Sequence, residues 1–327
     1  MKSFLLKTGL RDAVDISGLH VISVISNPLR FKSRYELYDR FSKQMSDLGA
    51  NHWTVEIAIG EREFAVTDHT NPKHIQFRTR EVLWHKENMI ELAIQRLPAD
   101  WKQVAWIDAD VIFSRQDILE ATVHQLQIYD VVQMFSHAID LGPQGEPIQT
   151  HNGFAWSYDQ NDRMPPQGPG YDGYYGYNTK RGFWHPGYAW AANRSFINKV
   201  GLFTSGILGS GDHHMAMAFI NQVQRSYPKD TGKRYVDELQ DYQSLCNQFL
   251  NGNLGYVSGS IFHEWHGKKK DRRYVDRWKI LTGNDFDPDD DIYRDWQGLY
   301  QIVPEKPRLR DQIRLYFGAR NEDSNEL

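Results

Sequence analysis

Cysteine and long apolar runs are scarce in this sequence. The single cysteine, Cys246, excludes an internal disulfide and fits a reducing compartment. No apolar stretch reaches the roughly 18 residues of a membrane span. The first 15 residues also have too short an apolar run for a signal peptide. We therefore expect a cytoplasmic protein with no membrane span.

Linkers and internal repeats are also missing, and positive charge is not in excess. No Ser/Gly-rich or charged linker divides the 327 residues, which favours one large domain. The net charge of -4 argues against a protein that binds nucleic acid nonspecifically through positive charge, although residues 268–273 form a local basic run. Aromatic residues, by contrast, are abundant: 10 Trp, 17 Tyr and 16 Phe supply many rings for stacking on sugars or bases.

Strand and helix patterns alternate through the first half of the chain. Ser33 and Glu36 have the spacing of a capping box, and Gly49 ends the helix that they would begin. The expected strands are 20–25, 55–59, 104–107 and 131–135, and the expected helices are 33–48, 82–96 and 116–126. This order predicts an α/β fold with a mostly parallel central sheet flanked by helices.

The second half begins with a long aperiodic segment. Residues 139–188 are rich in Gly, Pro, Tyr and Asn, which predicts a long aromatic loop with a functional role. The pattern then predicts helices at 194–200, 213–223 and 234–250 and a strand at 254–262, and Cys246 falls on a core-facing helical position. The residues beyond Gly283 carry no clear pattern, and we expect them to form a C-terminal extension.

Two aspartates follow the apolar strand at 104–107. If the strand continues, Asp108 and Asp110 point to the same face, and their mutual repulsion favours a cation between them. Carboxylate oxygens suit Mg²⁺ or Mn²⁺, and the carboxyl ends of parallel strands are where open α/β sheets bind ligands. The alternative is that one aspartate caps a turn and the other is solvated.

Two histidines end a second apolar strand downstream. His263 and His266 lie three residues apart. The zincin motif H-E-x-x-H needs its two histidines four residues apart on a helix, and here the second histidine comes one residue too early and is followed by Gly267. A histidine beside the carboxylates would complete a mixed oxygen and nitrogen site of the kind that Mn²⁺ accepts. A core histidine is a stronger alternative for His263 than for His266. Gly267 would leave room for a diphosphate, and the lysines after it would neutralise its charge.

Several stretches, in order over residues 21–270, resemble the GT-A fold glycosyltransferases, most nearly the β-1,4-galactosyltransferase type. NPLRFKSR at 27–34 is similar to the family's nucleotide-gripping loop, and WHK at 84–86 to the stretch that contacts the base. WIDAD at 106–110 resembles the D-x-D motif, and H-x-x-H at 263–266 has the family's metal-ligand spacing. The resemblance implies donor contacts from Pro28, Arg30, Arg34, Trp84, Lys86 and Asp108, and metal ligands at Asp110, His266 and His263.

The acceptor side of the resemblance is weaker. HPGYAW at 185–190 looks like the loop that shapes the sugar pocket, which implies roles for Trp184, His185, Gly187, Tyr188 and Trp190. GSGDHH at 209–214 occupies the place of the family's catalytic acidic motif. Asp212 is the candidate base and His213 its substitute. Asp212 is also placed to be the N-cap of the helix at 213–223, so the two interpretations compete.

The resemblance therefore implies an enzyme that moves a sugar from a nucleotide-sugar, UDP-linked by analogy, to an acceptor hydroxyl with inversion. It implies Mn²⁺ or Mg²⁺, a glycosyltransferase domain at 1–282 divided near residue 136 into nucleotide and acceptor halves, and an extension at 283–327. The sequences of the motifs most resemble those of uncharacterised bacterial and viral glycosyltransferases. We therefore expect the protein to lie in the cytoplasm of a bacterial cell or of a virus-infected host. A glycan is the favoured acceptor and DNA is not, although a DNA acceptor would place phosphates on the basic run.

Two other functions remain open. The motif of the DHH phosphoesterases, which hydrolyse phosphate esters with paired metals, is also matched by Asp212-His213-His214. A carbohydrate-binding protein without catalysis would account for the aromatic loop, including Tyr171–Tyr177 as a platform or lid, but not for the D-x-D motif.

Overall fold

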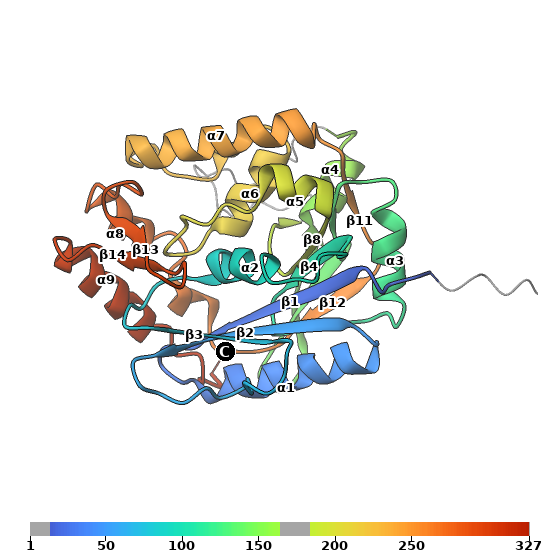
Figure 1. Cartoon of the computed structure of the whole chain (residues 1–327), viewed down its shortest axis with the longest axis horizontal. Coiled ribbons are helices and arrows are strands. Elements are labelled where there is room, and N and C mark those ends of the chain that lie inside the picture. The colour runs from blue at the N-terminus through green and yellow to red at the C-terminus, as the bar shows by residue number, and fades with distance from the viewer. Residues whose placement is uncertain (1–13, 164–183, 327) are drawn as a thin grey trace, which may run out of the picture.

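The computed structural model describes residues 14–163 and 184–326 and has the expected α/β architecture (Figure 1). Its centre is a seven-stranded sheet in the order β11-β6-β10-β4-β1-β2-β3, in which only β10 runs antiparallel to its neighbours. The strands are β1 (Leu19–Ser26), β2 (Asn51–Ile59), β3 (His74–Thr79), β4 (Gln103–Ile107), β6 (Val131–Gln133), β10 (Ala189–Asn193) and β11 (Leu254–Tyr256).

A second, five-stranded sheet continues from the ends of the first. Its order is β5-β12-β7-β8-β9, with β5 (Val111–Phe113), β7 (His137–Leu141), β8 (Pro147–Gly153), β9 (Trp184–His185) and β12 (Ser260–His263). The chain passes from the central sheet to the second one at three places: residues 108–110, 134–136 and 257–259. The first crossing carries both aspartates of the D-x-D motif, and the third leads into His263.

Helices cover both faces of the central sheet, because its strands bury side chains on both sides. On β4, Val104 and Trp106 face one core, whereas Ala105 and Ile107 face the other. One face is covered by α1 (Lys32–Asp47) and α3 (Ile118–Gln125). The other carries α2 (Lys86–Ile94), α4 (Phe154–Gln160), α5 (Arg194–Val200), α6 (Gly211–Phe219), α7 (Lys233–Phe249) and the C-terminal elements (Figure 1).

The C-terminal residues pack on the same core as the rest of the chain. They form α8 (Trp278–Thr282), the hairpin β13 (Ile292–Arg294) and β14 (Tyr300–Ile302), and α9 (Pro307–Gly318). Leu299, Leu309 and Ile313 are fully buried in the larger core cluster. The proposed boundary at residue 283 stays a prediction. None of the helices within 14–163 and 184–326 is both long and apolar enough to span a bilayer.

Three local predictions were wrong. The helix expected from residue 82 begins at Lys86. The strand expected at 254–262 is two strands in different sheets, β11 and β12, because Gly259 at φ 143° bends the chain between them. Residues 139–160 contain most of β7, β8 and α4 rather than an aperiodic loop. Cys246 is buried in α7, as expected.

The capping box predicted for Ser33 is not formed, and the N-cap alternative for Asp212 is also wrong. Ser33 lies inside α1, whose first amides are instead capped from the other end of the chain: Asp323 accepts hydrogen bonds from the backbone amides of Lys32 and Ser33 at 3.0 and 2.8 Å. Helix α6 begins one residue before Asp212, after Ser210 in a left-handed conformation at φ 73°. Asp212 is therefore in the first turn of α6 rather than at its N-cap.

Candidate active site

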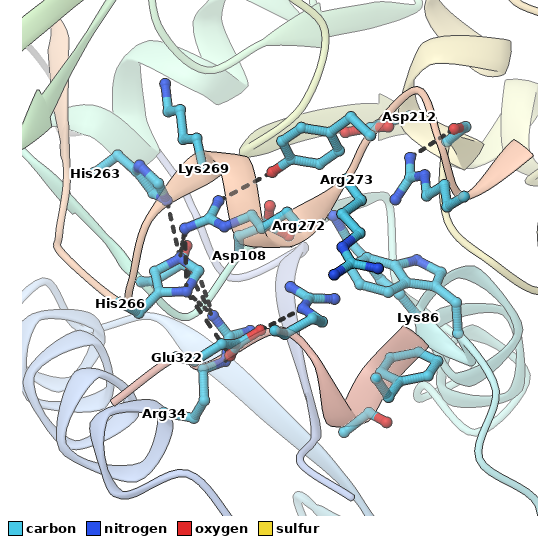
Figure 2. Close-up of a pocket in the computed structure, with 18 of the residues that line it drawn as sticks. Arg34, Lys86, Asp108, Asp212, His263, His266, Lys269, Arg272, Arg273 and Glu322 are labelled. Atoms are coloured by element: carbon cyan, nitrogen blue, oxygen red, sulfur yellow. Dashed lines mark hydrogen bonds and ion pairs between the residues drawn. The ribbon is translucent and has the colours of Figure 1, made fainter. Parts of the chain in front are cut away.

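A cavity of about 480 Å³ opens where the central sheet gives way to the second one. Its walls come from the turn after β1, the start of α2, residues 108–110, the end of β12 and the C-terminal segment. The size lies within the range of small-molecule sites, and the position matches the carboxyl-end rule for open α/β sheets. Figure 2 shows the charged side chains that converge on it.

Three potential metal ligands meet at the floor of this cavity. One ligand atom each from Asp110, His263 and His266 lies within 4.8 Å of the others. The Nε2 atoms of the two histidines are 3.2 Å apart, and His266 Nε2 is 3.1 Å from Asp110 Oδ2. All three side chains are buried, with at most 5% exposure. This geometry brings together the three ligands expected from the sequence.

The chemistry of the three residues fits a divalent cation. Asp110 Oδ1 is buried and has no hydrogen-bond partner among the described residues, so it keeps a free acceptor for an ion. Asp140 accepts a hydrogen bond from His263 Nδ1 at 2.8 Å, which leaves Nε2 as the unprotonated nitrogen. One carboxylate with two imidazoles is a donor set that Mn²⁺ accepts.

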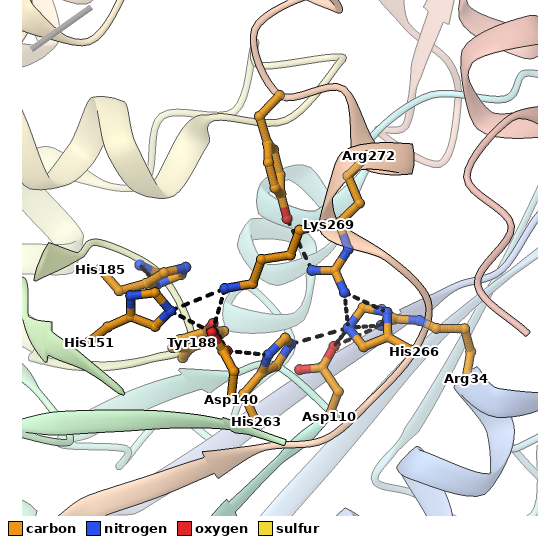
Figure 3. Close-up of polar contacts among 12 residues, drawn as sticks. Arg34, Asp110, Asp140, His151, His185, Tyr188, His263, His266, Lys269 and Arg272 are labelled. Atoms are coloured by element: carbon orange, nitrogen blue, oxygen red, sulfur yellow. Dashed lines mark hydrogen bonds and ion pairs between the residues drawn. The ribbon is translucent and has the colours of Figure 1, made fainter. Parts of the chain in front are cut away.

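Asp140 is the hub of a buried hydrogen-bond network beside the metal ligands (Figure 3). Its carboxylate also accepts from His151 Nε2 at 2.5 Å, from the Tyr188 hydroxyl at 3.1 Å and from the Lys269 ammonium. Burial alone would raise the pKa of Asp140, but the hydrogen bonds from His151 and His263 outweigh it and hold the pKa far below its usual value. Asp140 is therefore a permanent anion at this position.

Arginines flank the metal ligands. Arg34 donates to Asp110 Oδ2 at 2.7 Å, and Arg272 contacts His266 Nε2 at 3.0 Å. Burial would raise the pKa of Asp110, but the hydrogen bond and charge of His266, together with the charge of Arg34, hold it well below the usual value. Glu322, 5% exposed, pairs with Arg320 at 2.6 Å and with Arg34 at 3.4 Å.

Asp108 turns away from Asp110 and toward α2. The strand β4 ends at Ile107, so the same-face rule for residues two apart no longer applies at Asp108. Its carboxylate forms an ion pair with Lys86, and both side chains line the cavity. Burial would lower the pKa of Lys86, but the charges of Asp108 and Asp212 outweigh it and raise the pKa above its usual value. The two aspartates thus have separate partners.

Asp212 enters the cavity beside Gly187. A Cβ atom on Gly187 would collide with Oδ2 of Asp212, so the glycine is required for the aspartate to reach its position. The Asp212 Oδ1 accepts from the backbone amide of His213 at 2.8 Å. The Asp212 side chain is among those that line the cavity.

Most of the predicted site residues lie together. The cavity is lined by Pro28, Arg34, Trp84, Lys86, Asp108, Asp110, His185, Tyr188, Asp212, His263 and His266. Five predicted residues do not line it, and one of these, Gly187, lies against Asp212. Arg30 is exposed outside the cavity, and His213, Trp184 and Trp190 are buried in the core away from it. Trp184 packs edge-on against Phe154, so it belongs to the core rather than to a sugar platform.

Gly267 has a different role from the one expected. Its φ is +82°, and a Cβ atom would lie 2.6 Å from the carbonyl oxygen of Asn321. The glycine thus makes room for the C-terminal segment, residues 320–326, rather than for a diphosphate. Two of the three lysines after it are engaged: Lys268 pairs with Glu326 at 3.2 Å and Lys269 with Asp140. Tyr171–Tyr177 lie outside the described residues.

Sequence reasoning missed Asp140, His151, Arg272, Arg320 and Glu322. Asp140 and His151 lie in the segment read as an aperiodic loop, and Arg320 and Glu322 in a tail without a pattern. No sequence pattern indicates the inward position of Asp140, because the apolar neighbours Ile139 and Leu141 are only half-buried, whereas Asp140 is buried.

Comparisons with known proteins give only distant matches. No protein-family model and no curated protein matches this sequence. Among solved structures, mannosyl-3-phosphoglycerate synthase from Rubrobacter xylanophilus is 12% identical, with coverage of 87% of this chain and 84% of that chain and a TM-score of 0.39. The catalytic domain of Drosophila β1,4-galactosyltransferase 7, in complex with xylobiose, is 9% identical over 90% of this chain and 98% of that one, with a TM-score of 0.36.

A third structure, mannose-1-phosphate geranyltransferase from Thermus thermophilus, is 10% identical over 75% of each chain, with a TM-score of 0.34. Likenesses of this degree carry no argument about activity.

Proposed function

We propose that this protein is a metal-dependent glycosyltransferase that moves a sugar from a UDP-sugar to an acceptor hydroxyl with inversion. The observation that carries the proposal is the convergence of three side-chain groups on one cavity: a carboxylate and two imidazoles suited to Mn²⁺, a lysine–aspartate pair, and a separate carboxylate at a helix start. The UDP moiety, the inversion and the acceptor class rest on the motif resemblance.

Donor binding would use the floor and one wall of the cavity. Asp110, His263 and His266 would hold the cation, which supplies charge neutralisation for a diphosphate leaving group when bound. Arg34 lies beside them as a further positive charge, and guanidinium groups bind phosphate oxygens in a planar, bidentate way. Trp84 and Pro28 line the same cavity and offer apolar surface to a base.

Acceptor activation would belong to Asp212. Its carboxylate is held in place by the His213 amide and by the space that Gly187 leaves, and it lies on the cavity side of α6. A carboxylate in that position takes the proton from an acceptor hydroxyl as the new glycosidic bond forms. His213, 1% exposed and packed near Trp184, does not line the cavity and is not proposed as a substitute base.

The phosphoesterase alternative receives no support from the geometry. His214 bonds with Ser226 Oγ at 2.7 Å and with the Tyr235 hydroxyl at 3.2 Å, inside the core. Among the described residues, no cluster of potential metal ligands includes Asp212, His213 or His214. A paired-metal phosphoesterase would need these side chains beside Asp110. A carbohydrate-binding protein without catalysis remains the second candidate, because the cavity by itself suits a ligand as well as a substrate.

The test is metal-dependent nucleotide binding followed by a donor screen. Calorimetry should detect UDP binding that requires Mn²⁺ and is lost in Asp110→Asn, whereas the surface variant Asp117→Asn behaves as wild type. Hydrolysis of a panel of UDP-, GDP- and CDP-sugars in the presence of Mn²⁺ then identifies the donor. Binding of glycans without any effect of metal or nucleotide would establish the non-catalytic alternative instead.

A further inference from the structure

The basic turn formed by residues 268–273 has more positive charge than its surroundings neutralise. This turn contains a short 3-10 helix, Lys269–Arg272, and ends at Arg273 in a left-handed conformation with φ 44°. Four of its side chains, those of Lys269, Lys270, Arg272 and Arg273, line the cavity. A left-handed conformation is uncommon for a non-glycine residue, and such conformations concentrate at functional sites.

Arg272 is a buried cation without a carboxylate of its own. It is 7% exposed, and its contacts are the Tyr274 hydroxyl at 3.0 Å and His266 Nε2 at 3.0 Å. Within residues 14–163 and 184–326, no carboxylate lies within 4.0 Å of its guanidinium, and its Nε has no hydrogen-bond partner. Buried charges in proteins are normally paired, so this arginine is placed to meet an anion from outside the chain.

Lys270 and Arg273 extend this positive surface to the rim. Both are exposed, and neither forms an ion pair within 4.0 Å in the part of the chain that the structure describes. Lys269, in contrast, forms an ion pair with Asp140, and this pair fixes the turn against the second sheet (Figure 3). The close-up in Figure 2 shows Arg272 and Arg273 facing the cavity from the same turn.

The charge balance of the cavity exceeds what a nucleotide-sugar requires. Among the residues that the structure describes, eight basic and five acidic side chains line it, and buried Asp140 adds a sixth negative charge. The net charge of the cavity is therefore +2, and a bound divalent cation would raise it to +4. A nucleoside diphosphate sugar carries two negative charges, so two positive charges would stay unmatched and would attract a further anion.

We infer that the basic turn is a binding site for a phosphate group carried by the acceptor. This inference rests on the proposed function, because it assigns the acceptor of that transfer to the phosphate-bearing class. Arg272 and Arg273 supply planar guanidinium donors and Lys270 a point charge, the combination with which proteins hold phosphate oxygens. The donor diphosphate is the other source of the same chemistry, and the experiment separates the two.

The experiment titrates inorganic phosphate, as the probe, into protein saturated with UDP and Mg²⁺, followed by calorimetry. Wild type should bind phosphate saturably in addition to UDP. Lys270→Gln with Arg273→Gln should weaken phosphate binding about tenfold or more, since each charge-assisted hydrogen bond is worth roughly 1.5–3 kcal/mol. UDP affinity should stay within about twofold of wild type. Both residues are exposed, so the double variant should fold.

Lys279→Gln is the matched control, because it removes a lysine from the same segment that does not line the cavity. A double variant that loses UDP affinity instead would assign the turn to the donor and overturn the inference, as would wild type that shows no saturable phosphate binding. Failure of wild type to bind UDP would count against the glycosyltransferase. Phosphate titrated into nucleotide-free protein would still report on the turn by itself.

Discussion

His263 and Asp140 form a hydrogen bond of 2.8 Å that fixes which nitrogen of the imidazole faces the metal site. Because the carboxylate of Asp140 accepts the hydrogen bond from Nδ1–H, Nε2 is left to face His266 Nε2 at 3.2 Å. Hydrogen bonds of this kind to a metal-binding histidine orient its ring and raise its basicity. Asp140 is therefore a positioning residue for the proposed cation site.

Asp140→Asn should lower Mn²⁺ affinity about 10- to 100-fold, the usual cost of losing such a partner. The measurement is free Mn²⁺ by electron paramagnetic resonance during titration, which reads metal binding without any substrate. Asp117→Asn, an exposed aspartate on the way into α3, is the control and should bind Mn²⁺ as wild type does. Unchanged affinity in Asp140→Asn would remove the positioning role.

Gly187→Ala should impair turnover while leaving metal and UDP binding intact. The added methyl group would meet Oδ2 of Asp212, so the carboxylate has to leave its place in the cavity. If Asp212 is the base, kcat should fall about 100-fold or more, the typical contribution of general base catalysis. Gly318→Ala is the control, because nothing lies within 4 Å of the position of its Cβ. An active Gly187→Ala enzyme would exclude the proposed base.

Asp323→Ala should destabilise the protein through the start of α1. The carboxylate accepts hydrogen bonds from the amides of Lys32 and Ser33, and loss of a helix cap costs about 1 kcal/mol. In a protein of this size we expect Tm to fall by about 2 °C in thermal unfolding. Asp47→Ala, at the exposed end of the same helix, should change Tm less. An equal effect of the two substitutions would contradict the capping role.

Stability should fall as the pH drops below about 6.5, because the folded protein keeps several histidines neutral, among them half-buried His52 and buried His214. Burial lowers the pKa of His52 to about 4 and that of His214 to about 3, against 6.5 in an unfolded chain. Between these values the unfolded chain binds protons that the folded protein does not, so stability rises with pH in this window. At pH 5 each histidine should cost about 2 kcal/mol relative to pH 7.

His52→Gln tests this, because the new side chain keeps a polar group near Ser23, which His52 contacts at 2.7 Å. The free energy of unfolding in urea should depend less on pH between 5 and 7 in His52→Gln than in wild type. His124→Gln, which changes an exposed histidine of α3, should retain the wild-type slope. An unchanged slope in His52→Gln would show that other groups cause the acid sensitivity.

The sequence allowed the fold to be predicted where a pattern is local. The apolar runs of β1 and β4 and the helical spacing of α5 and α7 were placed within a few residues, because periodicity by itself distinguishes these elements. Asp110, His263 and His266 were predicted together from motif spacing, and the structure brings their ligand atoms within 4.8 Å. Their role as metal ligands stays a prediction.

Interactions between distant parts of the chain were not predictable in this way. Asp323 reaches α1 across about 290 positions, and Asp140 reaches His263 across 123. Neither pair leaves a periodic trace, and a carboxylate that caps a helix from afar looks like any surface acid in the sequence. Ser33 illustrates the error: its spacing to Glu36 suggested a local cap, but Asp323 already satisfies the first amides of that helix.

The position of Glu322 has a consequence for how the protein is made. Residues 320–326 lie over Gly267 and the start of α1, so they border both the metal ligands and Arg34. They leave the ribosome after every other residue of the site. The central sheet can therefore fold during translation, but the cavity gains its last wall only when this segment has been released, and ribosome-stalled chains ending before it should be folded yet unable to bind UDP.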